Sequence, residues 1–115
     1  MDLTASHFEN ILPWMQVIAR RTIRDFAKTH ASARTWLQSW LKTAEKASWK
    51  SLAEVRKAYA SADQFEHCLI FDKANDFRLI VRVTYSDSKR KGRLFVKHFL
   101  THAQYDRDQW KECCR

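Results

Sequence analysis

The stretch that decides the fold covers residues 77–106 and reads FRLIVRVTYSDSKRKGRLFVKHFLTHAQYD. Apolar and polar residues alternate along 77–85, which predicts a strand with two different faces. The apolar segment 94–100 predicts the returning strand, and the polar loop 86–93 between them holds the only glycine of the chain. One face of the first strand is expected to carry Phe77, Leu79, Val81, Val83 and Tyr85, and the other Arg78, Ile80, Arg82 and Thr84.

The segments before this hairpin predict a short strand followed by helices. MQVIA at 15–19 is an apolar run of strand length. Residues 20–30 predict a helix with Thr22 as N-cap and Asp25 in the first turn. A second helix is expected from Ser32, because apolar residues recur there at helical spacing. This apolar stripe consists of Trp36, Leu37, Trp40, Leu41 and Ala44.

A third helix is expected over 51–59, where Ser51 and Glu54 have the spacing of a capping box. The apolar run at 67–71 predicts another strand, and the Asn-Asp pair at 75–76 predicts the turn into the hairpin.

This order of elements predicts an α+β domain with an antiparallel sheet, helices packed on one face of that sheet, and a short helix at the C-terminal end. A chain of 115 residues is long enough for one compact domain. We expect that domain to cover residues 15–112, with 1–14 as an N-terminal extension.

Charge indicates the class of partner. The formal net charge is +8 and the isoelectric point is about 9.7. Such a balance favours a polyanion, which leaves nucleic acid, an anionic membrane surface or an acidic protein. No stretch approaches the roughly 18 apolar residues of a membrane span, so the expectation is a soluble, cytoplasmic protein with no membrane partner.

The three cysteines do not predict a disulfide framework or a CxxC site. Cys113 and Cys114 lie near a terminus that is expected to fray, and the expectation is three reduced thiols. A zinc site from His98, His102 and a cysteine fits no known ligand spacing. Cys68 lies in an apolar strand with nothing to activate it as a nucleophile.

The end of the hairpin carries the candidate site. Thr101 and Gln104 have the spacing of a second capping box, which ends the strand near Leu100 and starts a helix. His102 then occupies the first helical position, where the unpaired amides favour anions. His102 shares one side of this helix with Tyr105 and Asp106, and the carboxylate could orient or pair with the imidazole.

The neighbouring strand supplies cations, because Arg78 and Arg82 project from one face and suit phosphate oxygens. Strict alternation puts Lys97 and His98 on opposite faces, with Lys97 inside the candidate site and His98 outside. The structural alternative remains open: Tyr105 could be a core residue, and the two arginines could form a solvated, paired face. The loop 87–93, with Lys91 and Arg93, is either a solubilising hairpin tip or a contact for the RNA backbone.

Several pieces of the sequence carry a resemblance: ASWKS at 47–51, FRL at 77–79 and THAQYD at 101–106. Together with the helical region they resemble the HigB toxins of bacterial type II toxin–antitoxin modules, which are similar to the RelE group of mRNA interferases. The resemblance runs from about Gln16 to Asp106. It implies a small RelE-like domain, and an endoribonuclease that cleaves mRNA on the ribosome and is silenced by a helix-turn-helix antitoxin.

The resemblance also implies a chemistry that needs no metal or cofactor. The ribose 2′-OH attacks the adjacent phosphate and leaves a 2′,3′-cyclic phosphate and a 5′-OH. Arg78 would stabilise the phosphorane charge, and His102 and Tyr105 would transfer protons or orient the phosphate. Lys97 would be a second phosphate cation.

Lys50 would hold the RNA backbone, and Arg82 is a weaker candidate for the same role. The sequence departs from the family pattern at Leu100, where a small residue is usual, and at 74–76, where the usual glycine is missing. Which residue is the base and which the acid stays open. Two other functions also stay open: a basic module that binds nucleic acid without cleaving it, and a degenerate toxin that acts only through its antitoxin and operon.

Overall fold

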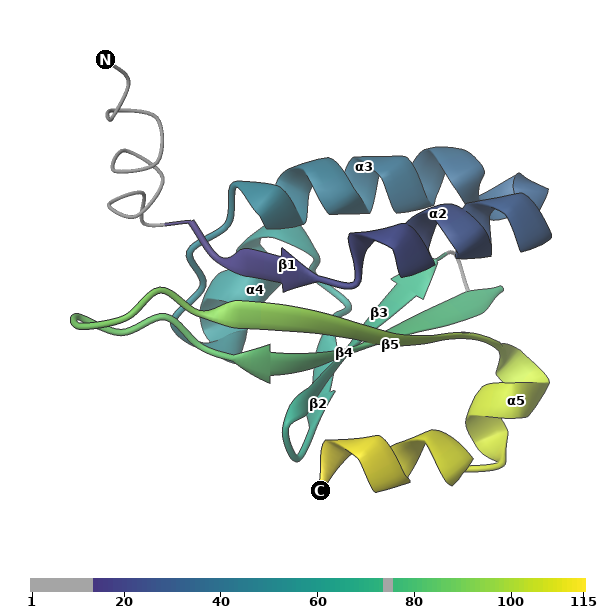
Figure 1. Cartoon of the computed structure of the whole chain (residues 1–115). Coiled ribbons are helices and arrows are strands. Elements are labelled where there is room, and N and C mark those ends of the chain that lie inside the picture. The colour runs from purple at the N-terminus through teal and green to yellow at the C-terminus, as the bar shows by residue number, and fades with distance from the viewer. Residues whose placement is uncertain (1–13, 74–75) are drawn as a thin grey trace, which may run out of the picture.

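A computed structural model of the chain describes residues 14–73 and 76–115 (Figure 1). Most of the expected N-terminal extension and Asn75 of the expected turn lie outside the described residues. In chain order the elements are β1 (Gln16–Ile18), α2 (Arg20–Thr29), η1 (Ala31–Ala33), α3 (Arg34–Glu45), α4 (Leu52–Ala58), β2 (Asp63–Phe65), β3 (Cys68–Lys73), β4 (Phe77–Thr84), β5 (Arg93–Thr101), α5 (His102–Asp106) and η2 (Gln109–Cys114).

The strands form one sheet in the order β1-β5-β4-β3-β2. Strands β2 to β5 pair antiparallel in chain order, which confirms the expected hairpin and α+β class. At one edge β1 pairs parallel to β5, so the sheet is mostly antiparallel. The chain between β1 and β5 runs through α2 to α4 and then through β2 to β4, so it is long enough for the crossover that a parallel pair requires.

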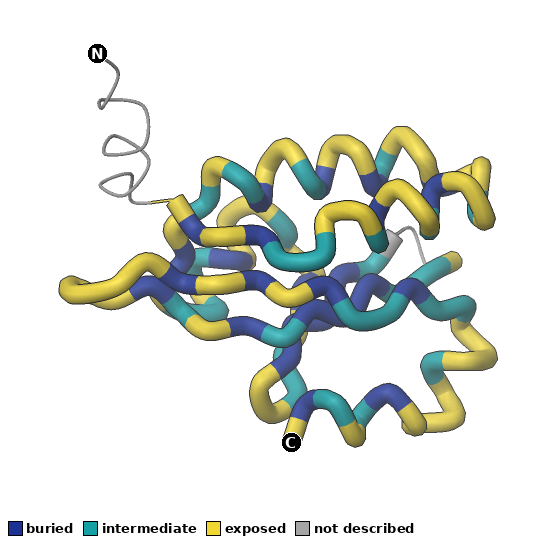
Figure 2. The backbone as a smooth tube through the Cα atoms, viewed as in Figure 1, coloured by how far each residue is buried: buried dark blue, intermediate teal, exposed yellow. Residues whose placement is uncertain are grey.

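One sheet face, which we call the helical face, packs against the N-terminal helices (Figure 1). The apolar stripe of α3 behaves as expected: Leu37, Trp40 and Ala44 are fully buried. The strands alternate between buried and more exposed positions (Figure 2), as period-two side-chain placement requires. The helical face carries Leu69, Phe71, Leu79, Val81, Val83, Leu94, Val96 and Phe99.

The start of each helix tests the capping predictions. The N-cap at Ser51 is confirmed, since its side chain accepts from the Glu54 amide. The reciprocal bond of a capping box is not formed, because the Glu54 carboxylate accepts from the amide of Lys50 instead of that of Ser51. The assignment of Thr22 as N-cap is wrong, because the N-cap of α2 is Ala19, three residues earlier, with its backbone in the left-handed region. The second helix begins with the 3-10 turn η1 around Ser32 and becomes α-helical at Arg34.

The C-terminal residues pack against the opposite sheet face (Figure 1). Cys114 forms a disulfide with Cys68 at the start of β3, and Cys113 is the free cysteine. The expectation of three reduced thiols and a frayed terminus is therefore wrong. Cys114 and Trp110 are almost completely buried against Ile70 and Ile80, so apolar contacts hold this end of the chain in place.

The hairpin loop is held by its own hydrogen bonds. The Asp87 carboxylate accepts from the Lys89 and Arg90 amides, which lowers the pKa of Asp87. Gly92 packs so closely against the backbone oxygen of Thr84 and the side chain of Met15 that a Cβ atom would collide with both. The single glycine is therefore required by this close approach.

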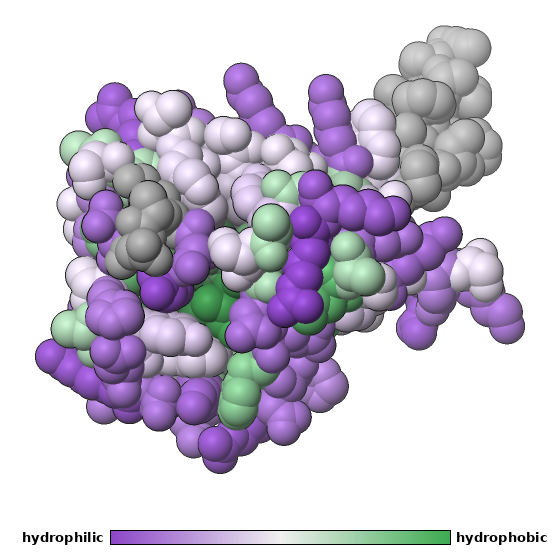
Figure 3. All heavy atoms as spheres, turned by 180° about the vertical axis from the view of Figure 1, so that it is seen from behind, coloured by the Kyte–Doolittle hydropathy of each residue, from purple (hydrophilic) through white to green (hydrophobic). Residues whose placement is uncertain are grey.

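The surface of the described residues is mostly hydrophilic when viewed from behind, with apolar residues in small patches (Figure 3). Within the described part of the chain, no helix has both the length and the apolar character needed to cross a membrane.

Candidate functional site

The sheet face opposite the helices carries four of the predicted cations, and we call it the cationic face. It is formed by the outward residues of β4 and β5, which include Arg78, Arg82, Arg93, Lys97 and His98. Arg78 and Thr84 are six strand positions apart, which corresponds to roughly 20 Å. The face is therefore long enough for an extended polyanion to lie along it.

Arg78 is at the α5 end of this face, where an ion pair and a ring contact help to hold its side chain. Its Nε lies 2.8 Å from Oδ1 of Asp72 on β3, and the arginine side chain is only 13% exposed. Its guanidinium carbon lies 5.3 Å from the centroid of the Tyr105 ring. This places Tyr105 beside Arg78, as predicted, and the antiparallel register opposite Asp72 explains the ion pair.

Tyr105 is fixed by the residues that follow α5. Its ring stacks on Trp110 with centroids 5.0 Å apart and planes 11° apart, and its carbonyl accepts from the Trp110 indole N–H. Burial raises the pKa of the phenol, and the nearby Arg78 charge opposes that shift. The phenol is therefore protonated at neutral pH and can donate a proton.

A bulge in β5 overturns the alternation predicted for Lys97 and His98. Ile80 pairs with His98 whereas Val81 pairs with Val96, so Lys97 is the extra residue. His98 therefore shares the face of Ile80. The Lys97 ammonium lies 3.9 Å from the centroid of the Phe95 ring, on that same face. The prediction that these two residues point to opposite faces is wrong.

His98 is thus a residue that sequence reasoning left outside the site. It lines a cavity of about 220 Å³ between β5 and the C-terminal residues, together with Leu100, Gln104, Arg107, Gln109 and Trp110. Burial, and then the charge of Lys97, lower the pKa of the imidazole. His98 is therefore neutral at neutral pH and can accept a proton.

The capping box that starts α5 is confirmed in full. The Thr101 hydroxyl accepts from the Gln104 amide, and the Gln104 side chain accepts from the Thr101 amide. His102 is 61% exposed, and its Nε2 lies 3.3 Å from Oδ2 of Asp106, as the spacing predicted. These two side chains pair with each other at the edge of the cationic face.

Of the remaining predicted cations, Arg82 and Arg93 lie on strands of this sheet, whereas Lys91 lies in the hairpin loop and Lys50 just before α4. Arg82 donates from Nη1 to the carbonyl oxygens of Cys113 and Arg115, at 2.8 and 3.4 Å. Lys91 and Arg93 line a shallow pocket at the opposite end of the face from Arg78. Lys50 is close to that end, because the carbonyl of its neighbour Trp49 accepts from the amide of Ser86.

The metal-ligating side chains that lie together, among the described residues, are Cys68, Cys113 and Cys114. Their sulfur atoms are within 4.8 Å of one another, and two of them form the disulfide. His98 and His102 are not in this group.

These observations define a small, basic α+β domain with helices on one face of its sheet and a row of cations on the other. A comparison with protein families identifies the family to which this domain belongs. Residues 33–108 match the HigB toxin family, the RelE-like toxic component of a toxin–antitoxin system. The chain belongs to this family, and the family implies an antitoxin as partner. A comparison with curated proteins finds no match.

Proposed function

We propose that this toxin is an endoribonuclease that cleaves mRNA on the ribosome, and that a helix-turn-helix antitoxin silences it. The observation that carries the proposal is the contact between Arg78 and Tyr105 on the cationic face, inside the region that matches the family. It puts a cation and a proton donor together at one end of a row of further cations. Cleavage of RNA through its own 2′-OH needs both.

Arg78 is the proposed phosphate ligand. Its guanidinium can present two parallel N–H groups to phosphate oxygens, and it would stabilise the extra negative charge of the phosphorane. The ion pair with Asp72 fixes the position of this side chain before RNA binds. Lys97, on the adjacent strand and the same face, is the second proposed phosphate cation.

Proton transfer is assigned to Tyr105 and a histidine. The raised pKa of Tyr105 keeps its phenol protonated, as is required of the group that would protonate the leaving 5′-oxygen. The lowered pKa of His98 suits a base that accepts the 2′-OH proton. His102 remains the base that the family resemblance favours, and its pairing with Asp106 would orient its ring. No metal or cofactor is required for this proposed mechanism.

The rest of the RNA would follow the cationic face away from Arg78. Arg93, Lys91 and Lys50 lie toward the hairpin-loop end, where they would contact backbone phosphates without reading sequence.

The test compares Arg78→Ala with Arg21→Ala, which removes the same charge from an exposed position on α2. Arg78→Ala should lower mRNA cleavage in a ribosome-containing extract by about 100-fold or more, and should relieve growth arrest in bacteria. Arg21→Ala should change neither. Products should carry 2′,3′-cyclic phosphate ends and form equally well with a chelator present. If both variants cleave like the unaltered protein, the site is not where we propose.

A second candidate function is inhibition by binding alone. Both central arginines already have partners, Asp72 for Arg78 and backbone carbonyls for Arg82, which argues against a free catalytic cation and favours RNA binding by the other cations of the face. Under this function Tyr105→Phe leaves growth arrest intact and no RNA ends appear. The removal of several lysines and arginines would abolish it.

A further inference from the structure

The C-terminal segment, residues 107–115, covers one part of the cationic face. The family match ends at Asp108, so Trp110, Cys113 and Cys114 lie beyond the matched region. The segment is nevertheless packed against the sheet rather than extended from it (Figure 1). Its role is therefore a separate question from the proposed cleavage chemistry.

Three kinds of contact hold the segment down. The disulfide joins Cys114 to Cys68, and the amide of His67 donates to the Cys114 carbonyl at 2.9 Å. Trp110, 4% exposed, packs into the small apolar cluster with Ile70 and Ile80. The covalent bond is the one contact of these whose presence depends on redox conditions.

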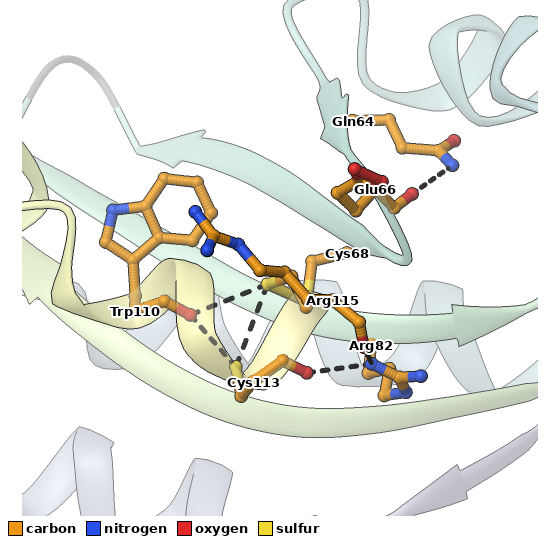
Figure 4. Close-up of a disulfide and its surroundings, with 8 residues drawn as sticks. Gln64, Glu66, Cys68, Arg82, Trp110, Cys113 and Arg115 are labelled. Carbon is orange, nitrogen blue, oxygen red and sulfur yellow. Dashed lines mark hydrogen bonds between the residues drawn. A yellow bond between two sulfur atoms is a disulfide. The ribbon is translucent and has the colours of Figure 1, made fainter.

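The segment also engages Arg82. The arginine donates from Nη1 to the carbonyl oxygens of Cys113 and Arg115, and Figure 4 shows the Cys113 carbonyl directed at the guanidinium. A guanidinium held in this way is less able to contact a phosphate. Oxidation at Cys68 and Cys114 thus keeps a cation of the proposed RNA-binding face occupied.

Cys113 provides access to the buried disulfide. Its sulfur lies 3.7 Å from that of Cys114, and it is partly exposed. The two bonded cysteines have no exposed surface. An external thiol therefore meets the Cys113 sulfur first.

We propose that Cys68, Cys113 and Cys114 form a redox site, and that its reduction by an external dithiol releases the C-terminal segment and frees Arg82 to bind RNA. The RNA part of this inference rests on the proposed function. The redox part does not.

The exchange runs through Cys113. Its thiolate attacks the Cys68 sulfur, a Cys68–Cys113 bond forms, and Cys114 leaves as a thiolate that takes up a proton. Attack on Cys114 is disfavoured, because adjacent Cα atoms are about 3.8 Å apart and ordinary disulfides need at least about 4.4 Å. One thiolate of the external dithiol then attacks the Cys113 sulfur and releases Cys68. The second thiol closes the external disulfide and releases Cys113, so two electrons pass from the dithiol to the protein.

The redox part is tested by counting thiols and by digestion with trypsin. The oxidised protein should show one reactive thiol and the reduced protein three, with dithiothreitol as the dithiol. Trypsin should cut at Arg107 and Lys111 faster after reduction. Cys113→Ser, which keeps the disulfide, should slow reduction at least about tenfold. Equal digestion of the two states, or reduction of Cys113→Ser at the full rate, would overturn the proposed redox site.

The RNA part is tested with a single-stranded oligonucleotide that carries 2′-O-methyl groups and cannot be cleaved. For a single strand, each phosphate contact contributes about 0.7 to the slope of log affinity against log salt. Reduction should therefore steepen the slope by about 0.7 in the unaltered protein and in Arg24→Ala, but not in Arg82→Ala.

The outcomes separate the two proposals. Equal slopes in both redox states, with RNA bound in both, contradict the release of Arg82 and leave the proposed function intact. Absence of binding in either state contradicts the proposed function and the RNA part together, while thiol counts and digestion still decide the redox site.

Discussion

The two faces of the sheet are stabilised in different ways. The helical face is covered by α2 to α4 and buries a continuous set of apolar side chains. The cationic face is covered only in part, by a short segment that depends on one small apolar cluster, one disulfide and the hydrogen bonds of Arg82. The comparison indicates that one face specifies the fold and leaves the other free to carry charge.

The largest expected effect is a difference in stability between substitutions of two phenylalanines on opposite faces of the sheet. Phe71, 1% exposed, packs on Trp40 and Tyr59, whereas Phe95 is 39% exposed on the cationic face. Phe71→Ala should lower the free energy of unfolding by about 3–5 kcal/mol, and Phe95→Ala by less than about 1 kcal/mol. Urea unfolding followed by circular dichroism measures both. Equal losses would contradict the assignment of the core to one face.

The next effect concerns the proposed proton transfer on the cationic face. The lowered pKa of His98 means that its imidazole loses its proton below the ordinary value near 6.5, so as a base it is active at neutral pH and is switched off as pH falls. Cleavage should rise with pH through the acidic range and level off by about pH 6.5.

His98→Gln should lower the cleavage rate about 100-fold and remove this acid limb. His102→Gln is the matched control at the exposed histidine. If the limb survives in His98→Gln and disappears in His102→Gln, the base is His102.

A smaller effect is expected at the start of α5. Thr101→Ala removes the hydroxyl that accepts from the Gln104 amide, and should lower the free energy of unfolding by about 1 kcal/mol. Thr101→Ser keeps an acceptor and should restore most of the loss, measured by thermal unfolding. If Ser and Ala behave alike, the cap contributes nothing to stability.

Sequence periodicity predicted most of the helical face. The alternation in 77–85 and the stripe of α3 both depend on local spacing, and both are observed. The parallel pairing of β1 and the N-cap of α2 at Ala19 were missed, because they depend on distant strands and on the left-handed backbone of Ala19.

The cationic face was less predictable. Arg78, Tyr105 and the α5 cap could be read from spacing, and Asp72 could have been paired with Arg78 from the hairpin register. The position of His98 could not be predicted, because nothing in the local sequence pattern indicates the bulge that places its side chain on the cationic face. The disulfide was missed since its cysteines are 46 residues apart and meet only through the fold.

The most direct test of the central claim, that the cationic face binds RNA, is acetylation of lysines with and without the 2′-O-methyl oligonucleotide. RNA should protect Lys97 and Lys91, which lie on the cationic face and its loop, and should leave Lys28 and Lys42 on the outer side of α2 and α3 equally reactive. Protection of Lys28 and Lys42 with no change at Lys97 would contradict the account.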